Sequence, residues 1–412
     1  MNIALSKPLF DEQELAELKQ VLESGWVMQG PKVAEFEKQF AAYLGCEWAV
    51  AVSSCSTALH LAMKAIGIGK GDEVIVPSLT WIATAAAVEE CGAKAVLCDI
   101  DRATFNADPE SIERLINQRT KAILAVNLFG LAADLPRLQE IAKRNEIELI
   151  EDAACSLGAT IAGRQSGTFG RLGCFSFHPR KSITTGEGGM IVGNSRSDET
   201  LLRSLRSHGV KANSTAPGGK PYDLGDFDKL GYNYRLTDLQ AAIGLAQMRK
   251  LDGIIERRRA IAAAYDKGLA GLENITLPVE PKGYRHTYQS YVLRVGENLP
   301  DPRHSDAAFE LRNQMMIQLQ QAGIATRPGT HAVHSLQYFR ESTGLQNWSL
   351  PNSWKAMNQS IALPLYPSLT DREVAYVIEA VRTAHNTLRG AIRRSDGESH
   401  QKTAPLGIAI GS

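Results

Sequence analysis

The feature that most constrains the fold of this 412-residue chain is the alternation of apolar strands and helical segments between residues 73 and 193. Short apolar runs typical of buried strands occur at residues 74–76, 95–97, 122–126, 148–150, 174–177 and 190–192. Helical segments such as residues 135–144 lie between them. Alternation on this scale indicates βαβ units, so we expect an α/β fold built on a mainly parallel sheet with right-handed crossovers.

Length and helix-capping signals indicate more than one domain. Thr237 with Gln240 opens one predicted helix, which leads toward a second domain. Thr370 with Glu373 opens the last one, and the apolar periodicity is lost after about residue 388, so we expect a disordered tail. The predicted units are an N-terminal segment with the first helix (1–30), a large cofactor-binding domain (31–250), a small C-terminal domain (251–388) and the tail (389–412).

Composition excludes several classes of function. Lysine plus arginine equals aspartate plus glutamate at 45 each, so no net charge recruits nucleic acid or an acidic membrane surface. The N-terminus carries no basic segment followed by an apolar one, and no apolar run reaches membrane-spanning length, so we expect a soluble cytoplasmic protein. The cysteines show no CxxC and no paired spacing with histidine, which argues against a zinc site or a disulfide framework and favours a reducing compartment. They are Cys46, Cys55, Cys91, Cys98, Cys155 and Cys174.

Lys181 stands where an apolar strand runs into a glycine-rich turn, in the stretch CFSFHPRKSITTGEGG of residues 174–189. A lysine that forms a Schiff base with pyridoxal phosphate needs a rigid strand behind it, little local bulk, and enough desolvation to keep some of its amine neutral. The sequence offers these conditions. The alternative is a surface lysine beside a flexible loop.

Asp152 follows at once on the short apolar strand of residues 147–151. Ligands of open α/β sheets bind at the carboxyl ends of the strands, and a carboxylate there can keep a pyridine nitrogen protonated. The alternative is a helix N-cap aspartate.

Small hydroxyl residues, Ser56 and Thr57 among them, precede an apolar run that ends at Gly67. This pattern predicts a helix whose N-terminus can bind a phosphate group, although capping alone would also explain it. Trp81 follows another strand, and its indole could stack on a cofactor ring or fill the core.

With these features together, the chain resembles the DegT/DnrJ/EryC1/StrS family of sugar aminotransferases over about residues 5–384. The stretches that carry the resemblance are SGWVMQGP (24–31), GKGDEVIVP (69–77), GYNYRLTD (231–238) and ALPLYP (362–367). It implies a pyridoxal 5′-phosphate enzyme of the aspartate aminotransferase fold (fold type I). Such a fold has a large domain with a mainly parallel seven-stranded sheet flanked by helices and a smaller C-terminal α+β domain.

The resemblance also implies roles for the reactive residues. Lys181 is similar to the lysine that bonds the cofactor, Asp152 to the partner of its pyridine nitrogen, and Trp81 to the aromatic residue that stacks on its ring. A few members carry histidine in place of this lysine and are dehydratases, so the lysine favours amino transfer.

Ser56, Thr57 and Ser176 fall on the family's phosphate-binding positions. Asn233, in the stretch GYNYRLTD, matches a residue that reaches the phosphate of the neighbouring subunit's cofactor. The resemblance therefore implies a homodimer with shared active sites.

Two residues depart from the family pattern. Cys155 stands near the cofactor's phenolic oxygen, where the family mostly carries glutamine or histidine, so we expect the hydrogen bond that tunes the ring to be altered. Cys55 replaces the usual glycine or alanine of the phosphate loop and exchanges one small side chain for another. Neither departure removes a catalytic group.

The acceptor is expected to face residues 325–338 of the small domain. Arg327, His331 and His334 are candidate contacts for a diphosphate or a sugar, and each histidine could equally lie in a solvated loop. Trp26 and His178 are further substrate candidates. The C-terminal segment is similar to that of family members that aminate nucleotide-linked 4-keto sugars, so such a sugar is the favoured acceptor, with glutamate as the favoured donor.

Three alternatives stay open at this stage. A keto-cyclitol aminotransferase of the scyllo-inosose type would share the cofactor motifs. A non-catalytic regulatory relative would bind the cofactor without reacting with glutamate. A nicotinamide oxidoreductase is disfavoured because no GxGxxG follows an early strand.

Overall fold

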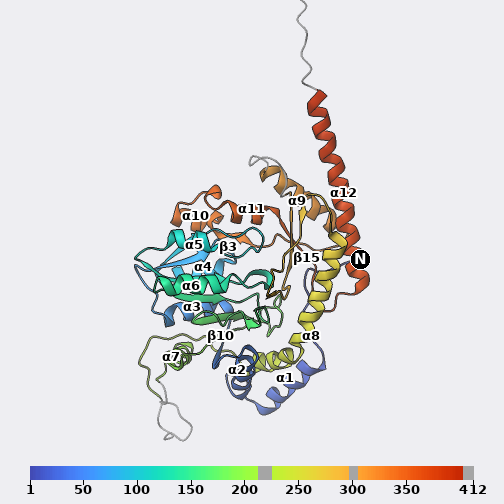
Figure 1. Ribbon diagram of the computed structural model, residues 1–412. Helices are drawn as coiled ribbons and strands as arrows, with labels where there is room; N and C mark the ends of the chain where they lie inside the picture. Colours follow the sequence, from blue (N-terminus) through green and yellow to red (C-terminus); the bar gives the residue numbers. More distant parts are fainter. Residues whose placement is uncertain (212–224, 297–304, 402–412) are drawn as a thin grey trace, which may run out of the picture.

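The computed structural model describes residues 1–211, 225–296 and 305–401, and within these ranges the chain forms a large sheet and a smaller one, both covered by helices (Figure 1). The large sheet has seven strands in the order β1-β10-β9-β6-β5-β2-β4. Four neighbouring pairs, from β9 through to β4, are parallel, whereas β10 is antiparallel to both of its neighbours. The strands are β1 (Trp48–Val52), β2 (Glu73–Pro77), β4 (Lys94–Cys98), β5 (Thr120–Val126), β6 (Glu148–Asp152), β9 (Leu172–Ser176) and β10 (Gly189–Gly193).

All six predicted strands form in this sheet, so the predicted α/β class with a mainly parallel seven-stranded sheet is confirmed. Successive side chains of β2 pack into different cores. Val74 and Val76 join one apolar cluster, whereas Ile75 joins another. Because successive residues of a strand point to opposite faces, a continuous apolar run is what a sheet covered on both faces requires.

Helices cover both faces of the large sheet. Residues of α3, α4 and α7 pack in the cluster that contains Val74, and residues of α5 and α6 pack in the one that contains Ile75. A third cluster joins α2 and the first half of α8 to β1, β9 and β10. These helices are α2 (Pro31–Leu44), α3 (Cys55–Ala65), α4 (Ile82–Glu89), α5 (Pro109–Leu115), α6 (Leu135–Arg144), α7 (Arg196–Arg206) and α8 (Asp238–Leu269), and α1 (Glu12–Ser24) packs on α8.

The smaller sheet has the antiparallel order β11-β13-β15, and its strands are β11 (Ile275–Thr276), β13 (Tyr291–Val295) and β15 (Ser360–Leu363). Its apolar cluster includes the second half of α8, which therefore runs from one core into the other. The predicted boundary at residue 250 falls inside this continuous helix, and we keep the division into domains as a proposal. The surrounding helices are α9 (Ser305–Gln321), α10 (Gln337–Thr343), α11 (Pro351–Gln359) and α12 (Asp371–Gln401).

A short strand pair joins the two units beside the large sheet's carboxyl edge. Strand β3 (Leu79–Thr80) pairs with β14 (His331–Ala332), so that Thr80 and His331 lie opposite each other. The remaining short elements are β7 (Thr160–Ile161), β8 (Arg164–Gln165), β12 (Tyr284–Arg285), η1 (Leu128–Gly130), η3 (Val333–Ser335) and η4 (Asn347–Ser349).

The last helix begins as predicted but ends later. Thr370 accepts the backbone N–H of Glu373, and the Glu373 carboxylate accepts the backbone N–H of Thr370 at 2.8 Å, which confirms the capping box. Helix α12 then continues past residue 388 to Gln401 and projects from the body of the molecule (Figure 1). The helix thus extends beyond the predicted boundary at residue 388, and the predicted disorder of the tail stays a prediction. Residues 402–412 lie outside the described residues.

Candidate active site

A cavity of about 560 Å³ lies between the carboxyl ends of β5, β6 and β9 and the smaller unit. Val126, Asp152 and Ser176, which end these three strands, all line it. Residues 289–290, 327–330 and 362–365 close it from the other unit. Ligand binding at the carboxyl edge of the sheet is therefore possible where the sequence predicted it.

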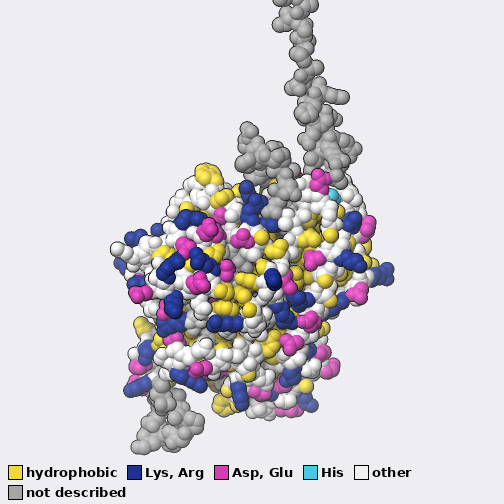
Figure 2. Space-filling view, in the orientation of Figure 1, with side chains coloured by type: hydrophobic (Ala, Val, Ile, Leu, Met, Phe, Trp, Pro, Cys, Tyr) yellow, Lys and Arg dark blue, Asp and Glu magenta, His cyan; other side chains and the backbone are white. Residues whose placement is uncertain are grey.

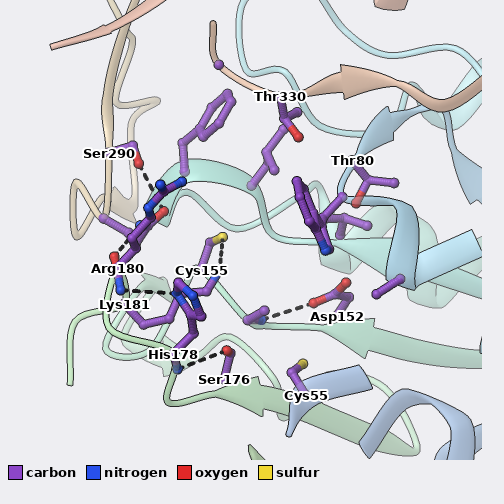
Figure 3. Close-up of a pocket in the computed structure, with 18 of the residues that line it drawn as sticks. Cys55, Thr80, Asp152, Cys155, Ser176, His178, Arg180, Lys181, Ser290 and Thr330 are labelled. Carbon is purple, nitrogen blue, oxygen red and sulfur yellow. Dashed lines mark hydrogen bonds between the residues drawn. The ribbon is translucent and has the colours of Figure 1, made fainter. Parts of the chain in front are cut away.

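Eight of the predicted site residues line this cavity. They are Ser56, Trp81, Asp152, Cys155, Ser176, His178, Lys181 and Arg327. Figure 3 shows Lys181, Cys155 and His178 on one side of it and Asp152 with Thr80 on the other.

Lys181 is held at the cavity wall by a tight turn, in which its backbone N–H donates to the carbonyl of His178 at 2.9 Å. Its Nζ donates to Cys155 Sγ at 3.1 Å. Burial disfavours the charged ammonium, but the Cys155 and Cys55 sulfurs and the Asp152 carboxylate favour it, and the pKa of Lys181 is raised. Burial by itself therefore does not decide the charge of this amine, because its neighbours oppose the effect of burial.

Asp152 is buried and held by two donors. Thr84 Oγ1 donates to Asp152 Oδ2 at 2.7 Å, and the backbone N–H of Ala154 donates to Oδ1 at 3.1 Å. Burial is the largest effect and raises the pKa of Asp152, although Thr84, Ala154 and Lys181 oppose the shift. The helix N-cap alternative is excluded, because turns and not a helix follow β6.

The predicted phosphate site lies at the start of α3. Ser54 is the N-cap, and it forms a capping box with Thr57, whose hydroxyl also donates to the Ser54 carbonyl at 2.8 Å. Ser56 lines the cavity, whereas Thr57 does not. Glycine is required at position 189, since a Cβ there would lie 2.4 Å from the Ser54 carbonyl oxygen and would push β10 away from the helix start.

Trp81 does not fill the core. Its side chain is 56% exposed, it lines the cavity, and its ring meets the His331 ring edge-on at 5.6 Å. His331 thus supports Trp81 and lies behind the cavity lining. On the opposite wall, Ser176 Oγ accepts the backbone N–H of His178 at 3.3 Å.

Three predicted site residues lie away from this cavity. Asn233 is exposed and pairs with Ser207 in an isolated bridge. Trp26 is 54% exposed, and its Nε1 donates to the Gln29 carbonyl at 3.1 Å. Neither belongs to the wall that this chain alone builds.

His334 is the third, and its prediction as a substrate contact is wrong. It is fully buried, its Nδ1 lies 2.6 Å from Ser78 Oγ, and its Nε2 lies 3.1 Å from the Asn347 carbonyl oxygen. A carbonyl only accepts, so Nε2 carries the proton and Ser78 donates to Nδ1. The two ring nitrogens hold η3 against Ser78, between β2 and β3, and against the start of η4, and burial lowers the pKa of His334.

Several cavity residues were not predicted from the sequence. Thr80 and Thr84 support Asp152, and Gln289 of the smaller unit donates through Nε2 to the Arg180 carbonyl at 2.7 Å. Arg180 was overlooked although it precedes Lys181 directly. Helical spacing could not have linked Thr84 to Thr80, because Thr80 ends β3 and α4 begins only at Ile82.

The residues around the cavity fit pyridoxal phosphate. Asp152 is a buried carboxylate that forms no ion pair in the described parts of the chain, so a protonated ring nitrogen would supply the missing cation. The amide-bearing start of α3 suits a phosphate, and Trp81 offers a flat apolar surface between them. Lys181 offers the amine on the facing side.

Comparison with known proteins identifies the family. Residues 8–382 match the DegT/DnrJ/EryC1/StrS aminotransferase family. The chain belongs to this family. It is an aminotransferase with pyridoxal 5′-phosphate as its cofactor, as the sequence predicted.

The similar proteins cover nearly the whole chain. GDP-perosamine synthase of Caulobacter vibrioides is 38% identical over 382 residues, which are 92% of this chain and 97% of the relative. The spore coat polysaccharide biosynthesis protein SpsC of Bacillus subtilis is 36% identical over 380 residues, 92% of this chain and 95% of the relative. Among solved structures, Spr1654 of Streptococcus pneumoniae in its PLP-form gives a TM-score of 0.86 at 29% identity and covers 94% of this chain and 99% of that one.

Two further observations concern the described residues alone. None of their helices is both long and apolar enough to cross a membrane. No group of three or more histidine, cysteine, aspartate or glutamate side chains among them is arranged to hold a metal ion.

Proposed function

We propose that this aminotransferase transfers the amino group of an amino acid, L-glutamate as the favoured donor, to the keto group of a nucleotide-linked sugar, with a 4-keto sugar favoured. The arrangement that carries the proposal is one cavity with Lys181 on one wall and buried Asp152 on the other. The choice of acceptor is supported by the 38% identity to GDP-perosamine synthase, whose name specifies a GDP-linked sugar, and by SpsC, a polysaccharide biosynthesis protein. The product would serve amino-sugar synthesis for a cell-surface polysaccharide, a lipopolysaccharide or a secondary metabolite.

When bound, pyridoxal phosphate supplies a conjugated ring that stabilises negative charge at the substrate carbon next to nitrogen. Asp152, which accepts from Thr84 and Ala154, would pair with a protonated ring nitrogen. Trp81 would pack against the face of the ring. Lys181 would hold the cofactor through its amine and, when that amine is free, would move a proton at the donor's α-carbon.

Phosphate binding is assigned to the start of α3 together with two hydroxyls. Ser56 lies on α3 and Ser176 ends β9, and both face the cavity. Thr57 supports the helix start, because its backbone N–H donates to Ser54 Oγ at 3.2 Å and its hydroxyl donates to the Ser54 carbonyl at 2.8 Å. The positive end of the helix dipole adds to the attraction for the dianion.

We also propose a homodimer with shared active sites. Asn233 is exposed and outside its own cavity, which leaves it available to reach the phosphate in a second copy. Trp26, Val27 and Met28 are each more than 40% exposed, and such an apolar run suits burial against another chain. In this arrangement Trp26 can approach the partner's substrate.

We place the protein in the cytoplasm. All six cysteines are free thiols in the structure, and none forms a disulfide. Free thiols are typical of a reducing compartment.

The test is a two-step spectroscopic assay. The purified enzyme is first converted to its amine form with L-glutamate, and a panel of nucleotide-linked keto sugars and keto-cyclitols is then screened for recovery of the starting absorbance. We expect recovery with a nucleotide-linked 4-keto sugar. Recovery with a cyclitol alone would identify a keto-cyclitol aminotransferase, and no conversion by any amino acid would identify a non-catalytic regulatory relative.

A further inference from the structure

The guanidinium group of Arg180 faces the cavity and has no partner among the residues that the structure describes. Its side chain lines the cavity and is exposed, and in the described residues it makes no hydrogen bond and no ion pair. Most arginines at the surface of this protein do pair with a carboxylate, as Arg171 does with Asp198 at 2.8 Å. The Arg180 charge is therefore available to a ligand.

The backbone of Arg180 is fixed on both sides, so the guanidinium is carried by a rigid support. Its N–H donates to His178 Nδ1 at 3.2 Å, and its carbonyl accepts from Gln289 Nε2 at 2.7 Å. Ser290 lines the cavity beside it, as Figure 3 shows. A support of this kind preorganises a binding group and reduces the entropy lost on binding.

The side chains that line the cavity include more cationic groups than carboxylates, so the cavity can bind an anion near Lys181. Its cationic residues are Arg180, Lys181 and Arg327, and its carboxylates are Asp152 and Glu187. Asp152 is held at the base by Thr84, and Glu187 forms no ion pair with either arginine among the described residues. Arg327 belongs to the other unit, where its backbone carbonyl accepts from Ala362 at 2.8 Å.

We propose that Arg180 binds the α-carboxylate of the amino donor. This proposal rests on the proposed function. In an α-amino acid the carboxylate is bonded to the carbon from which Lys181 removes a proton, so its binding group must lie beside that lysine, and Arg180 is the residue that precedes it in the same turn. A guanidinium matches a carboxylate with two parallel N–H···O bonds and thereby fixes the orientation of the Cα–H bond.

The two arginines are assigned to different anions. Arg180 binds the carboxylate of the donor, whereas Arg327, on the opposite unit, is the proposed contact for the diphosphate of the acceptor. Substitutions at the two positions should therefore affect different half-reactions.

The test compares Arg180→Gln, Arg180→Lys and the control Arg327→Gln in the holoenzyme. In the donor half-reaction, the half-saturating L-glutamate concentration should rise about 10- to 100-fold in Arg180→Gln, the loss expected for a hydrogen bond to a charged group, and less in Arg180→Lys. In the acceptor half-reaction, Arg180→Gln should leave the half-saturating sugar concentration unchanged, whereas Arg327→Gln should raise it. An equal effect of Arg180→Gln on both half-reactions, or none on the first, would overturn the proposal.

A binding measurement separates this proposal from the proposed function. Glutarate carries both carboxylates and no amino group, so its affinity for the holoenzyme, measured by calorimetry, should fall about tenfold or more in Arg180→Gln and not in Arg327→Gln. If no keto sugar reacts but glutarate binding weakens in this way, the proposed acceptor is wrong and the role of Arg180 stands. If a sugar is aminated and glutarate binds both variants equally, the role of Arg180 is refuted.

Discussion

Substituting Thr84 by valine tests how far a hydrogen bond limits the rise in the pKa of Asp152 that burial causes. Thr84 donates its one hydroxyl proton to Asp152 at 2.7 Å, so Thr80, which lies 2.8 Å from Thr84 Oγ1, must donate to Thr84 in turn. Valine has nearly the same shape and removes only the donor. A hydrogen bond to a charged group contributes about 1.5–3 kcal/mol, so its loss should raise the pKa of Asp152 further.

The effect should depend on pH in a defined direction. Burial already raises the pKa of Asp152 above 3.8, so the cofactor-free folded state holds its proton to a higher pH than the unfolded chain, and stability falls as pH rises through that interval. Thr84→Val should extend the interval upward. Above this pH interval the variant's free energy of unfolding should be lower than that of the wild type by about 1.5–3 kcal/mol. Below the interval, Asp152 is protonated in both the folded and the unfolded state, so the variant should lose only the roughly 1 kcal/mol of a neutral hydrogen bond.

The assay is urea unfolding of the cofactor-free protein at a series of pH values, with the free energy of unfolding extrapolated to water. Thr84→Ser keeps the hydroxyl and Thr80→Val removes only the neutral bond, so both should show little pH dependence beyond that of the wild type. A Thr84→Val loss that is the same at every pH, or no larger than that of Thr80→Val, would refute the reasoning.

Three other predictions use separate parts of the structure. Cys155→Ala removes a group that raises the pKa of Lys181, so the pKa of that amine should fall and the acidic limb of the donor half-reaction should move to lower pH in a stopped-flow pH profile. His334→Ala should lower the free energy of unfolding by about 1–3 kcal/mol in urea while leaving the half-saturating acceptor concentration within twofold, since its ring bonds are structural. Arg258 is buried, burial lowers its pKa to about 10, and it donates to the backbone carbonyls of Tyr288, Gln289 and Leu365, all in the smaller unit. Arg258→Met should therefore lower the free energy of unfolding by about 2–4 kcal/mol, measured by calorimetry. An unchanged pH profile would contradict the first of these predictions, and a defect specific to the acceptor would contradict the second. An unchanged free energy of unfolding would contradict the third.

The fold could be predicted where local pattern and long-range packing agree. The apolar runs that became β2, β5 and β6 are buried on both faces, so their sequences carry the signal of a covered parallel sheet without needing tertiary information. The sequence pattern predicted neither strand β1 nor the antiparallel direction of β10, because both depend on the edge of the sheet at which the strands pair.

The site was predictable where a residue's place on an element fixes its direction. Asp152 and Ser176 end strands, so they had to face the carboxyl edge. His334 was mistaken because a histidine in a polar loop looks the same whether it faces a cavity or packs on Ser78, and only the pairing of β14 with β3 decides. Arg180 was missed because an arginine beside a reactive lysine carries no motif of its own.

Bonding of the cofactor to Lys181, opposite Asp152, is tested most directly by borohydride reduction of the yellow holoenzyme followed by peptide mass mapping. We expect one modified peptide, with the pyridoxyl group on Lys181. A label on a different lysine, or no label in protein that still transfers amino groups, would contradict it.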